Sequence, residues 1–317
     1  MAIHKEKINP EDDLGFGTQP VIKSQPVINK DGSINVKRTG LPFFSTSNNY
    51  HSLITMSWGK FWLIIFSCYM AANLFFAGIY FSLGADVLDG KSGNTDFDRF
   101  MDAFFFSAQT ISTVGYGHIS PKGMVANTVA ALESMMGLLA FALATGLLYG
   151  RFSRPSAKIL YSENVLIAPY RNNGRGLMFR LANLRRNILI DLEMEVVFGY
   201  NDEENGKTVR KFFQLELERK SVSILTLNWT VVHPLDENSP LKDITPEELE
   251  AKQASISVIL KTFDDTFSQT VHSRTSYIYS DVIWGAKFVP AFTRHPDGHV
   301  ILDLDKIGKY EMVSLDA

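Results

Sequence analysis

The sequence has a single cysteine, Cys68, among 317 residues, so one chain cannot form a disulfide with itself. Neither sign of charge is in large excess, because 31 Lys and Arg residues stand against 34 Asp and Glu residues. A formal net charge of −3 gives no electrostatic reason to expect a nucleic-acid partner. The histidines are scattered, and no glycine loop of the kind that cradles a phosphate is present. These absences argue against an enzyme.

Two long stretches are almost free of charge. No charged residue occurs from Phe61 to Ala85, and Glu133 is the only one from Met124 to Gly150. At about 1.5 Å of rise per residue, each stretch can cross the ~30 Å hydrocarbon layer of a membrane. Helices of soluble proteins rarely stay apolar on all faces for such a length. We therefore predict two membrane spans, at 58–83 and 124–150, within a pore domain of residues 58–155.

The charges that flank these spans predict their orientation. Basic residues precede the first span and follow the second, whereas the loop between the spans is acidic. By the positive-inside rule, both termini lie in the cytoplasm of a cell whose membrane the chain crosses twice. The first span begins about sixty residues into the chain, behind a polar leader, and is therefore not a signal peptide.

The residues before the first span divide into two parts. Residues 1–45 mix charged, proline, glycine and asparagine residues without periodicity, which predicts a cytoplasmic leader with no fold of its own. Residues 46–57 carry Tyr50, Leu53 and Ile54 at helical spacing, followed by Trp58. This pattern predicts an amphipathic helix in the membrane interface. The alternative is a frayed extension of the first span.

A segment between the spans is too short to cross. Phe100 to Ser112 is compatible with a helix of about 13 residues, roughly 20 Å long, so it has to re-enter on the side from which it came. Irregular backbone at membrane depth occurs only where protein buries it or where it lines a watery path. The segment that follows within 100–117 is therefore expected to line such a path. Its residues are Thr113, Val114, Gly115, Tyr116 and Gly117.

This TVGYG segment has the composition of a potassium filter. Gly115 and Gly117 can adopt backbone angles that other residues avoid, so the carbonyls of residues 113–116 can point the same way. Four copies around one axis would replace the hydration shell of K⁺, so K⁺ is expected as the permeant ligand and no cofactor is expected. One chain supplies a quarter of such a site, which predicts a homotetramer.

The sequence pattern changes after Pro155, where the long apolar stretches end. From residue 156 to 317, short segments alternate apolar and polar residues, as in Leu215 to Glu218 and Ile256 to Val258, and turn sequences separate them. This pattern predicts an all-β sandwich. One helix is expected within TPEELEAKQ, with Thr245 as its N-cap and Pro246 in its first turn.

At this point the chain resembles the inward-rectifier potassium channel family, in particular its prokaryotic, KirBac-type members. The resemblance is carried by FFFSAQTISTVGYG, ALESMMGLLAFALATGLLYGRFSRP, LMFRLANLR and WTVVHPLDENSPL, and it runs from about Tyr50 to the C-terminal strands. It implies a membrane α-helical two-span potassium channel pore on a cytoplasmic immunoglobulin-like β-sandwich, assembled as a homotetramer. A bacterial inner membrane is the expected location. We also class the chain with voltage-gated channels.

The resemblance places the channel lumen between the directions of Phe141 and Tyr149. At about 100° per residue, further residues near that line are Ser134, Leu138 and Thr145. Phe141 and Tyr149 are expected to form a hydrophobic gate, with ordinary helix packing as the alternative. Glu133 points roughly 120° away from the lumen and, with Gln109, is expected to brace the filter from behind. The alternative for Glu133 is an ion-binding ring.

Two glycines of the second span and one basic cluster can each be interpreted in two ways. Gly137 and Gly146 could be hinges of the second span or sites of close packing. A basic cluster resembles the phosphoinositide-binding cluster of the family and predicts binding to anionic lipid, although anchoring by the positive-inside rule explains it as well. Its members are Lys60, Arg151, Arg154 and Lys158.

The chain departs from animal members of the family at two positions. Those members usually carry Glu at the position of Gln109, and an acid or Asn at the position of Phe141 that attracts blocking Mg²⁺ and polyamines. An amide and an aromatic ring here argue against strong rectification by that block, with Mg²⁺, Ba²⁺ and polyamines kept as candidate blockers. His118, after the filter, is either a solvated mouth residue or a pH-sensitive group.

Two other functions stay open. One is a two-span potassium channel gated by a nucleotide or Ca²⁺ through a Rossmann-like domain, against which the lack of a βαβ fingerprint after Pro155 argues. The other is a membrane-anchored β-sandwich sensor with a vestigial pore. The leading hypothesis is a potassium-selective channel of inward-rectifier type.

Overall fold

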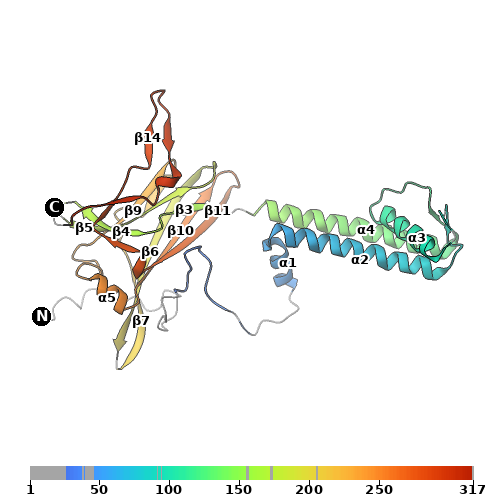
Figure 1. Cartoon of the computed structure of the whole chain (residues 1–317), viewed down its shortest axis with the longest axis horizontal. Coiled ribbons are helices and arrows are strands. Elements are labelled where there is room, and N and C mark those ends of the chain that lie inside the picture. The colour runs from blue at the N-terminus through green and yellow to red at the C-terminus, as the bar shows by residue number, and fades with distance from the viewer. Residues whose placement is uncertain are drawn as a thin grey trace. The chain divides into compact units, whose positions relative to one another are not determined.

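The computed structural model describes residues 26–37, 39, 46–90, 92–93, 95–154, 157–171, 174–204 and 206–315. The chain divides into two compact units (Figure 1). One unit contains residues 40–154 and is helical, and the other contains residues 1–39 together with 155–317 and is built mainly of strands.

The described residues of the helical unit form four helices: α1 (Thr46–Thr55), α2 (Trp58–Leu83), α3 (Asp96–Ile111) and α4 (Gly123–Phe152). α2 and α4 have 26 and 30 residues and are apolar enough to cross a membrane. Only 17% and 11% of their most apolar windows are buried inside the chain. The core helix of a soluble protein would be mostly buried, so this exposure agrees with two spans that meet lipid or neighbouring chains.

α3 packs between α2 and α4 through a compact apolar core. The edge of the Tyr80 ring meets Phe106, with 5.0 Å between the ring centroids. The buried members of this core are Phe76, Ala77, Tyr80, Leu88, Ala103, Phe106 and Ile119. β1 (Leu88–Asp89) pairs with β2 (Ser120–Pro121), which joins the loop before α3 to the segment after the filter.

α3 begins earlier than the predicted start at Phe100. Thr95 caps it, because its hydroxyl accepts a hydrogen bond from the amide of Asp98 while the Asp98 carboxylate accepts one from the amide of Thr95. The sequence signal for this capping box is a Thr followed three residues later by an acid. The 16 residues of α3 make a helix of about 24 Å, still shorter than the hydrocarbon layer.

In its described residues, the other unit is a sandwich of two five-stranded sheets (Figure 1). The first sheet contains β6 (Leu189–Glu204), β7 (Lys207–Gln214), β8 (Ser221–Ile224), β10 (Ser255–Asp264) and β11 (Gln269–Ile278). The second contains β3 (Ile159–Tyr161), β4 (Val165–Tyr170), β5 (Gly174–Asn183), β9 (Asn228–Pro234) and β12 (Val282–Trp284). Among the described strands only β12 and β4 pair in parallel, so no Rossmann-like unit is present there.

Two smaller pairs complete the strands. β13 (Ala286–Phe288) pairs with β16 (Tyr310–Met312), and β14 (Phe292–Arg294) pairs with β15 (Val300–Leu302). Two short 3₁₀ turns, η1 (Tyr279–Asp281) and η2 (Leu304–Lys306), lie between strands.

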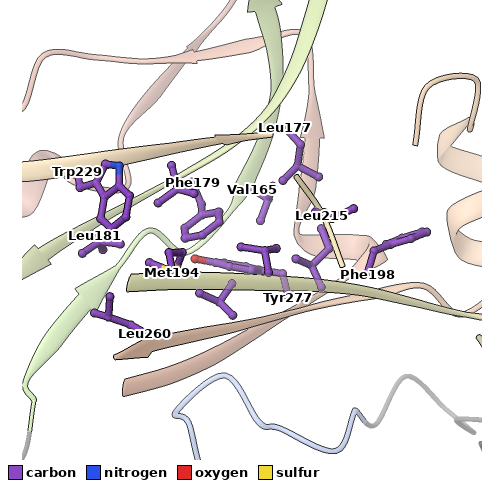
Figure 2. Packing of buried hydrophobic residues seen from close by; sticks show 14 of the residues in the cluster. Val165, Leu177, Phe179, Leu181, Met194, Phe198, Leu215, Trp229, Leu260 and Tyr277 are labelled. Atoms are coloured by element: carbon purple, nitrogen blue, oxygen red, sulfur yellow. The ribbon is translucent and has the colours of Figure 1, made fainter. Parts of the chain in front are cut away.

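The core of the sandwich lies between the two sheets, as Figure 2 shows. Phe179 of β5 and Tyr277 of β11 are fully buried and pack together with their ring centroids 5.8 Å apart. The Tyr277 hydroxyl is not left unsatisfied, because it donates to the carbonyl of Ser162 over 3.0 Å. Aromatic and branched side chains from both sheets therefore form one continuous core.

One predicted strand ends earlier than its alternating pattern does. Leu215 to Glu218 alternate as a strand would, but β7 ends at Gln214. The amide of Leu215 bonds the carbonyl of Val196 in one sheet, and the amide of Glu218 bonds that of Val232 in the other. The segment therefore crosses between the sheets. By contrast, the predicted helix is α5 (Pro246–Ala251), with Thr245 as its N-cap.

Part of the leader is folded. The hydroxyl of Thr275 donates to the carbonyl of Lys30 over 2.9 Å, and that of Ser276 donates to the carbonyl of Ile28 over 2.6 Å. Lys30 also pairs with Asp281 at 2.9 Å. The expectation of a leader without a fold is therefore wrong for residues 26–37, whereas residues 1–25 and 40–45 lie outside the described residues.

Candidate ion-conduction site

One glutamine holds the start of the TVGYG segment. The backbone carbonyl of Gln109 accepts hydrogen bonds from the amides of Val114 and Gly115, over 3.0 and 3.2 Å. Its side-chain Oε1 accepts a third, 3.2 Å long, from the amide of Tyr116. Gln109 is buried, and its Nε2 has no partner among the described residues. A residue at the end of α3 thus binds three consecutive amides of the predicted filter.

Every second residue of the segment has its backbone in the left-handed region. Thr113, Gly115 and Gly117 have positive φ angles of 59°, 55° and 81°. Among the described residues, no atom outside the two adjoining residues lies within 4 Å of the place where a Cβ would sit on Gly115 or Gly117, so the backbone angle and not the available space calls for glycine. Sequence reasoning anticipated the two glycines but missed the same conformation at Thr113.

Glu133 joins α4 to both neighbouring helices. It is fully buried. Its Oε2 accepts a hydrogen bond from the Tyr80 hydroxyl of α2 over 2.7 Å, and its Oε1 accepts one from the Ser107 hydroxyl of α3 over 2.5 Å. The carboxyl group therefore lies behind α3, on the side of α4 that packs against the rest of the chain.

Asn73 extends this polar cluster into α2. Its Oδ1 lies 3.2 Å from the Ser107 hydroxyl, and its Nδ2 donates to the carbonyl of Tyr69 over 2.8 Å. Like Glu133, it is fully buried. Sequence reasoning missed Asn73, Tyr80 and Ser107. A signal was present, because Asn73 is the one amide side chain in residues 58–83 and polar groups within a membrane span are costly.

The two glycines of α4 have different surroundings. A Cβ on Gly137 would lie 2.2 Å from the carbonyl oxygen of Ile111, so α4 and the end of α3 touch there. The structure thus favours close packing at Gly137 over the predicted hinge. Nothing lies within 4 Å of the corresponding position at Gly146, where the hinge stays a prediction.

The predicted lumen residues lie on one stripe of α4. Leu138, Phe141 and Tyr149 have 62%, 73% and 74% of their surface exposed in the single chain. Thr145 is exposed as well, and Ser134 is half-buried. Glu133 and Gly137 are buried, so the chain's own packing separates the predicted lumen side of α4 from the predicted filter brace.

Arg151 departs from its prediction as a lipid ligand. Its two terminal nitrogens donate to the carbonyls of Leu53 and Met56 over 2.7 and 2.8 Å. Its guanidinium carbon lies 4.4 Å from the centroid of Trp58 and 4.5 Å from a ring of Phe61. The remaining members of the basic cluster, and the mouth residue, are exposed: Lys60, Arg154, Lys158 and His118.

No cation site made of side chains accompanies this arrangement. Within the described ranges, no group of three or more His, Cys, Asp or Glu side chains could hold a metal ion.

Two apolar spans, a short helix between them, an alternating glycine-containing segment and a large all-β unit define a two-span membrane channel. A family model described as "Inward rectifier potassium channel C-terminal domain" matches residues 159–316, and one described as "Ion channel" matches residues 54–154. The chain belongs to the inward rectifier potassium channel family.

Individual relatives agree. The chain is 37% identical over 292 residues to the inward rectifier potassium channel Kirbac3.1 of Paramagnetospirillum magnetotacticum, which covers 92% of this chain and 97% of that one. It is 27% identical over 308 residues to the ATP-sensitive inward rectifier potassium channel 10 of Rattus norvegicus, with 90% and 80% covered. The ATP-sensitive inward rectifier potassium channel 15 of Mus musculus is 26% identical over 327 residues, with 92% and 86% covered. These relatives are channels and not enzymes.

The classification as a voltage-gated channel is not supported. The family model of the β unit and all three relatives are inward rectifiers. Voltage sensors are arginine-rich helices within the membrane, whereas the basic residues of α2 and α4 are confined to Lys60 and Arg151 near their ends.

Proposed function

We propose that four copies of the chain form a pore in which TVGYG binds and passes K⁺ passively. The observation that carries this proposal is the left-handed backbone at Thr113, Gly115 and Gly117, held by the three hydrogen bonds to Gln109. Alternation of hand turns successive peptide groups, so the carbonyls of residues 113–116 can face one axis. Rings of such carbonyls replace the hydration shell of K⁺.

Assembly as a homotetramer is part of the same proposal. One chain supplies one strand of carbonyls, which cannot surround an ion. Val114 and Tyr116 of that strand leave 53% and 80% of their surface exposed in the single chain. Exposed apolar side chains at membrane depth next to polar backbone require cover from protein, which neighbouring copies would supply.

The buried carboxyl group and the exposed stripe of α4 have separate roles in this proposal. Glu133 and Gln109 brace the filter from behind, and neither contacts the ion. Phe141 and Tyr149 form rings of aromatic side chains that gate the inner end of the pore by excluding water. Ser134, Leu138 and Thr145 line the path between filter and gate.

The orientation and the lipid partner complete the proposal. Both termini face the cytoplasm, because basic residues lie at the ends of α2 and α4 that adjoin them. Lys60, Arg154 and Lys158 are exposed and suited to anionic lipid headgroups, phosphoinositides among them. The membrane is a bacterial inner membrane, and Ba²⁺, Mg²⁺ and polyamines are candidate pore blockers.

Flux into liposomes tests the proposed filter. Purified protein is expected to carry Rb⁺ and K⁺, to be blocked by Ba²⁺ and to carry no comparable Na⁺ flux. Gly115→Ala should abolish selective flux, because its φ of 55° strains any residue with a Cβ. Gly78→Ala in α2 makes the same chemical change where nothing lies within 4 Å and should leave the flux intact. Absence of flux in every lipid would instead favour a membrane-anchored sensor with a vestigial pore.

A further inference from the structure

The guanidinium of Arg151 lies at the C-terminal ends of two helices. Arg151 is in the last turn of α4, and it donates to the carbonyl of Leu53, in the last turn of α1. It also donates to the carbonyl of Met56, between α1 and α2. One side chain thus ties the end of α4 to the segment where α1 gives way to α2.

Electrostatics favours this position for a cation. The last carbonyls of a helix have no amide further along the chain to bond, and the partial charge at that end is negative. A guanidinium offers a planar fork of donors that can satisfy two such oxygens at once. Hydrogen bonds from a charged donor are also stronger than those between neutral groups.

Aromatic rings cover the same guanidinium. Trp58 and Phe61 both lie within 4.5 Å of its central carbon, measured to their ring centroids. Phe61 is fully buried, and Trp58 also packs against Phe152 with ring centroids 5.2 Å apart. Two of the five guanidinium N–H donors are therefore engaged by carbonyls and rings cover the planar group, so half-buried Arg151 is less available to a lipid phosphate than the exposed Lys60 and Arg154.

A second contact brings α1 against α4 one residue earlier. A Cβ on Gly150 would lie 3.0 Å from the hydroxyl oxygen of Tyr50 and 3.8 Å from Cγ2 of Ile54. Both residues belong to α1. The absence of a side chain at Gly150 therefore lets α1 lie close to α4 beside Tyr149, the residue of the proposed gate.

We propose that Arg151 is a latch between α1 and α4, meaning that its hydrogen bonds to Leu53 and Met56 hold the inner end of α4 in the narrow arrangement of the pore. Arg151 is then a positioning residue for the gate and not a ligand of lipid headgroups. Lipid charge acts through the exposed Lys60, Arg154 and Lys158. This inference rests on the proposed gate at Tyr149.

The first test measures α1 itself and needs no flux. In full-length protein with Cys68→Ser, a spin label is attached through His51→Cys on the exposed side of α1. Arg151→Gln should raise the mobility of the label, because the shorter Gln side chain lacks both the charge and the two-nitrogen fork that reaches the two carbonyls. Arg151→Lys should give an intermediate mobility, since an ammonium keeps the charge without the planar fork. Arg294→Gln, the same loss of charge at an exposed position of β14, should leave the mobility unchanged.

The second test measures the gate. In neutral lipid, Arg151→Gln should raise the Rb⁺ flux by about tenfold, which corresponds to the loss of one charge-assisted hydrogen bond, and Arg151→Lys should raise it less. The ratio of flux with anionic lipid to flux without it should stay near the wild-type ratio for Arg151→Gln and should move toward one for Arg154→Gln. Equal amounts of tetramer are compared.

Two outcomes would overturn the latch. If Arg151→Gln changes neither the label mobility nor the flux, then the hydrogen bonds of Arg151 to Leu53 and Met56 do not hold α1 or the gate in place. A lost lipid response with unchanged mobility and basal flux would assign Arg151 to lipid binding. If wild-type protein carries no flux in any lipid, the proposed pore fails, and label mobility still decides whether Arg151 fixes α1.

Discussion

The hydroxyl of Ser107 lies 2.5 Å from Oε1 of Glu133, and this contact joins α3 to α4 inside the membrane unit. Ser107 also lies 3.2 Å from Asn73 of α2. Burying such groups is costly unless each finds a partner, so a cluster shared by three helices fixes their relative positions. The proposed filter begins at the end of α3, and its position therefore depends on these bonds.

Removal of the Glu133 carboxyl group should disturb the filter. Glu133→Ala leaves the hydroxyls of Ser107 and Tyr80 without their acceptor and opens a cavity, so we expect a loss of about 3 kcal/mol or more in stability and lower selectivity for K⁺ over Na⁺. Glu133→Gln keeps one acceptor oxygen and should be intermediate. The ratio of K⁺ to Na⁺ flux and the thermal stability of the assembly measure both effects. An unchanged ratio in Glu133→Ala would contradict the bracing role.

The Gln109 side chain should matter for the outer part of the filter only. Gln109→Leu removes the acceptor of the Tyr116 amide, whereas the bonds from Val114 and Gly115 go to the backbone carbonyl and persist. We expect reduced selectivity, while Gln109→Glu retains an acceptor and should be milder. Competition between Rb⁺ and Na⁺ in the flux assay measures the difference. If both variants kept the selectivity of the wild type, the side-chain hydrogen bond would be dispensable.

Gly137 and Gly146 should respond oppositely to alanine. A Cβ at Gly137 would overlap the carbonyl oxygen of Ile111 at 2.2 Å, and neither α4 nor the end of α3 can yield without disturbing the filter. Gly137→Ala should therefore give little assembled protein. Gly146→Ala meets no atom within 4 Å and should assemble normally. Size-exclusion chromatography of the two variants makes the comparison, and normal assembly of both would contradict close packing at Gly137.

A pH effect is expected in the sandwich at His233. Its Nδ1 lies 2.5 Å from the carbonyl of Glu216, and its Nε2 lies 2.8 Å from the hydroxyl of Ser239. Burial lowers the pKa of His233 below its usual value near 6.5, despite the opposing effect of Glu216 and Asp236. The unfolded state then binds the proton more readily, so stability is full above about pH 6.5 and falls as the pH drops below it.

Thermal unfolding of the full chain at about pH 7.5 and about pH 5.5 checks this sign. The drop in Tm on acidification should be smaller in His233→Gln than in the wild type. His299 is exposed near β15, and His299→Gln provides a control that should keep the full drop. A drop of equal size in His233→Gln would show that other groups cause the acid sensitivity.

The membrane helices could be predicted from hydropathy, because length and apolarity alone decide whether a helix can cross. The first predicted span coincides with α2, and α4 extends the second span by one residue at its start and two at its end. The apolar pattern predicts a start at Phe100, but the capping box of Thr95 and Asp98 begins α3 at Asp96. Leu215 to Glu218 alternate as a strand would, but the same alternation also suits a segment that crosses between two sheets, so the pattern alone does not distinguish the two.

Side-chain partners were harder to predict. Charge and position predict that Arg151 binds lipid. Its partners are instead two carbonyls at the end of α1 and just after it, about one hundred residues earlier in the chain, and no local sequence pattern encodes that contact. Thr113 adopts the left-handed region that sequence reasoning reserves for glycine, because its neighbours are held by Gln109. Asn73, by contrast, stood out in an apolar stretch and could have been identified.

The folded segment at residues 26–37 gives the β unit two covalent connections to the membrane helices. One runs from residue 37 to α1, and the other runs from α4 to residue 157. Arg151 bonds the end of α1 to the end of α4, so these two routes meet at one guanidinium. Two covalent routes therefore join the β unit to one bonded pair of helix ends, and a cut in residues 38–45 should leave the β unit joined to that pair by the route through residues 155 and 156 alone.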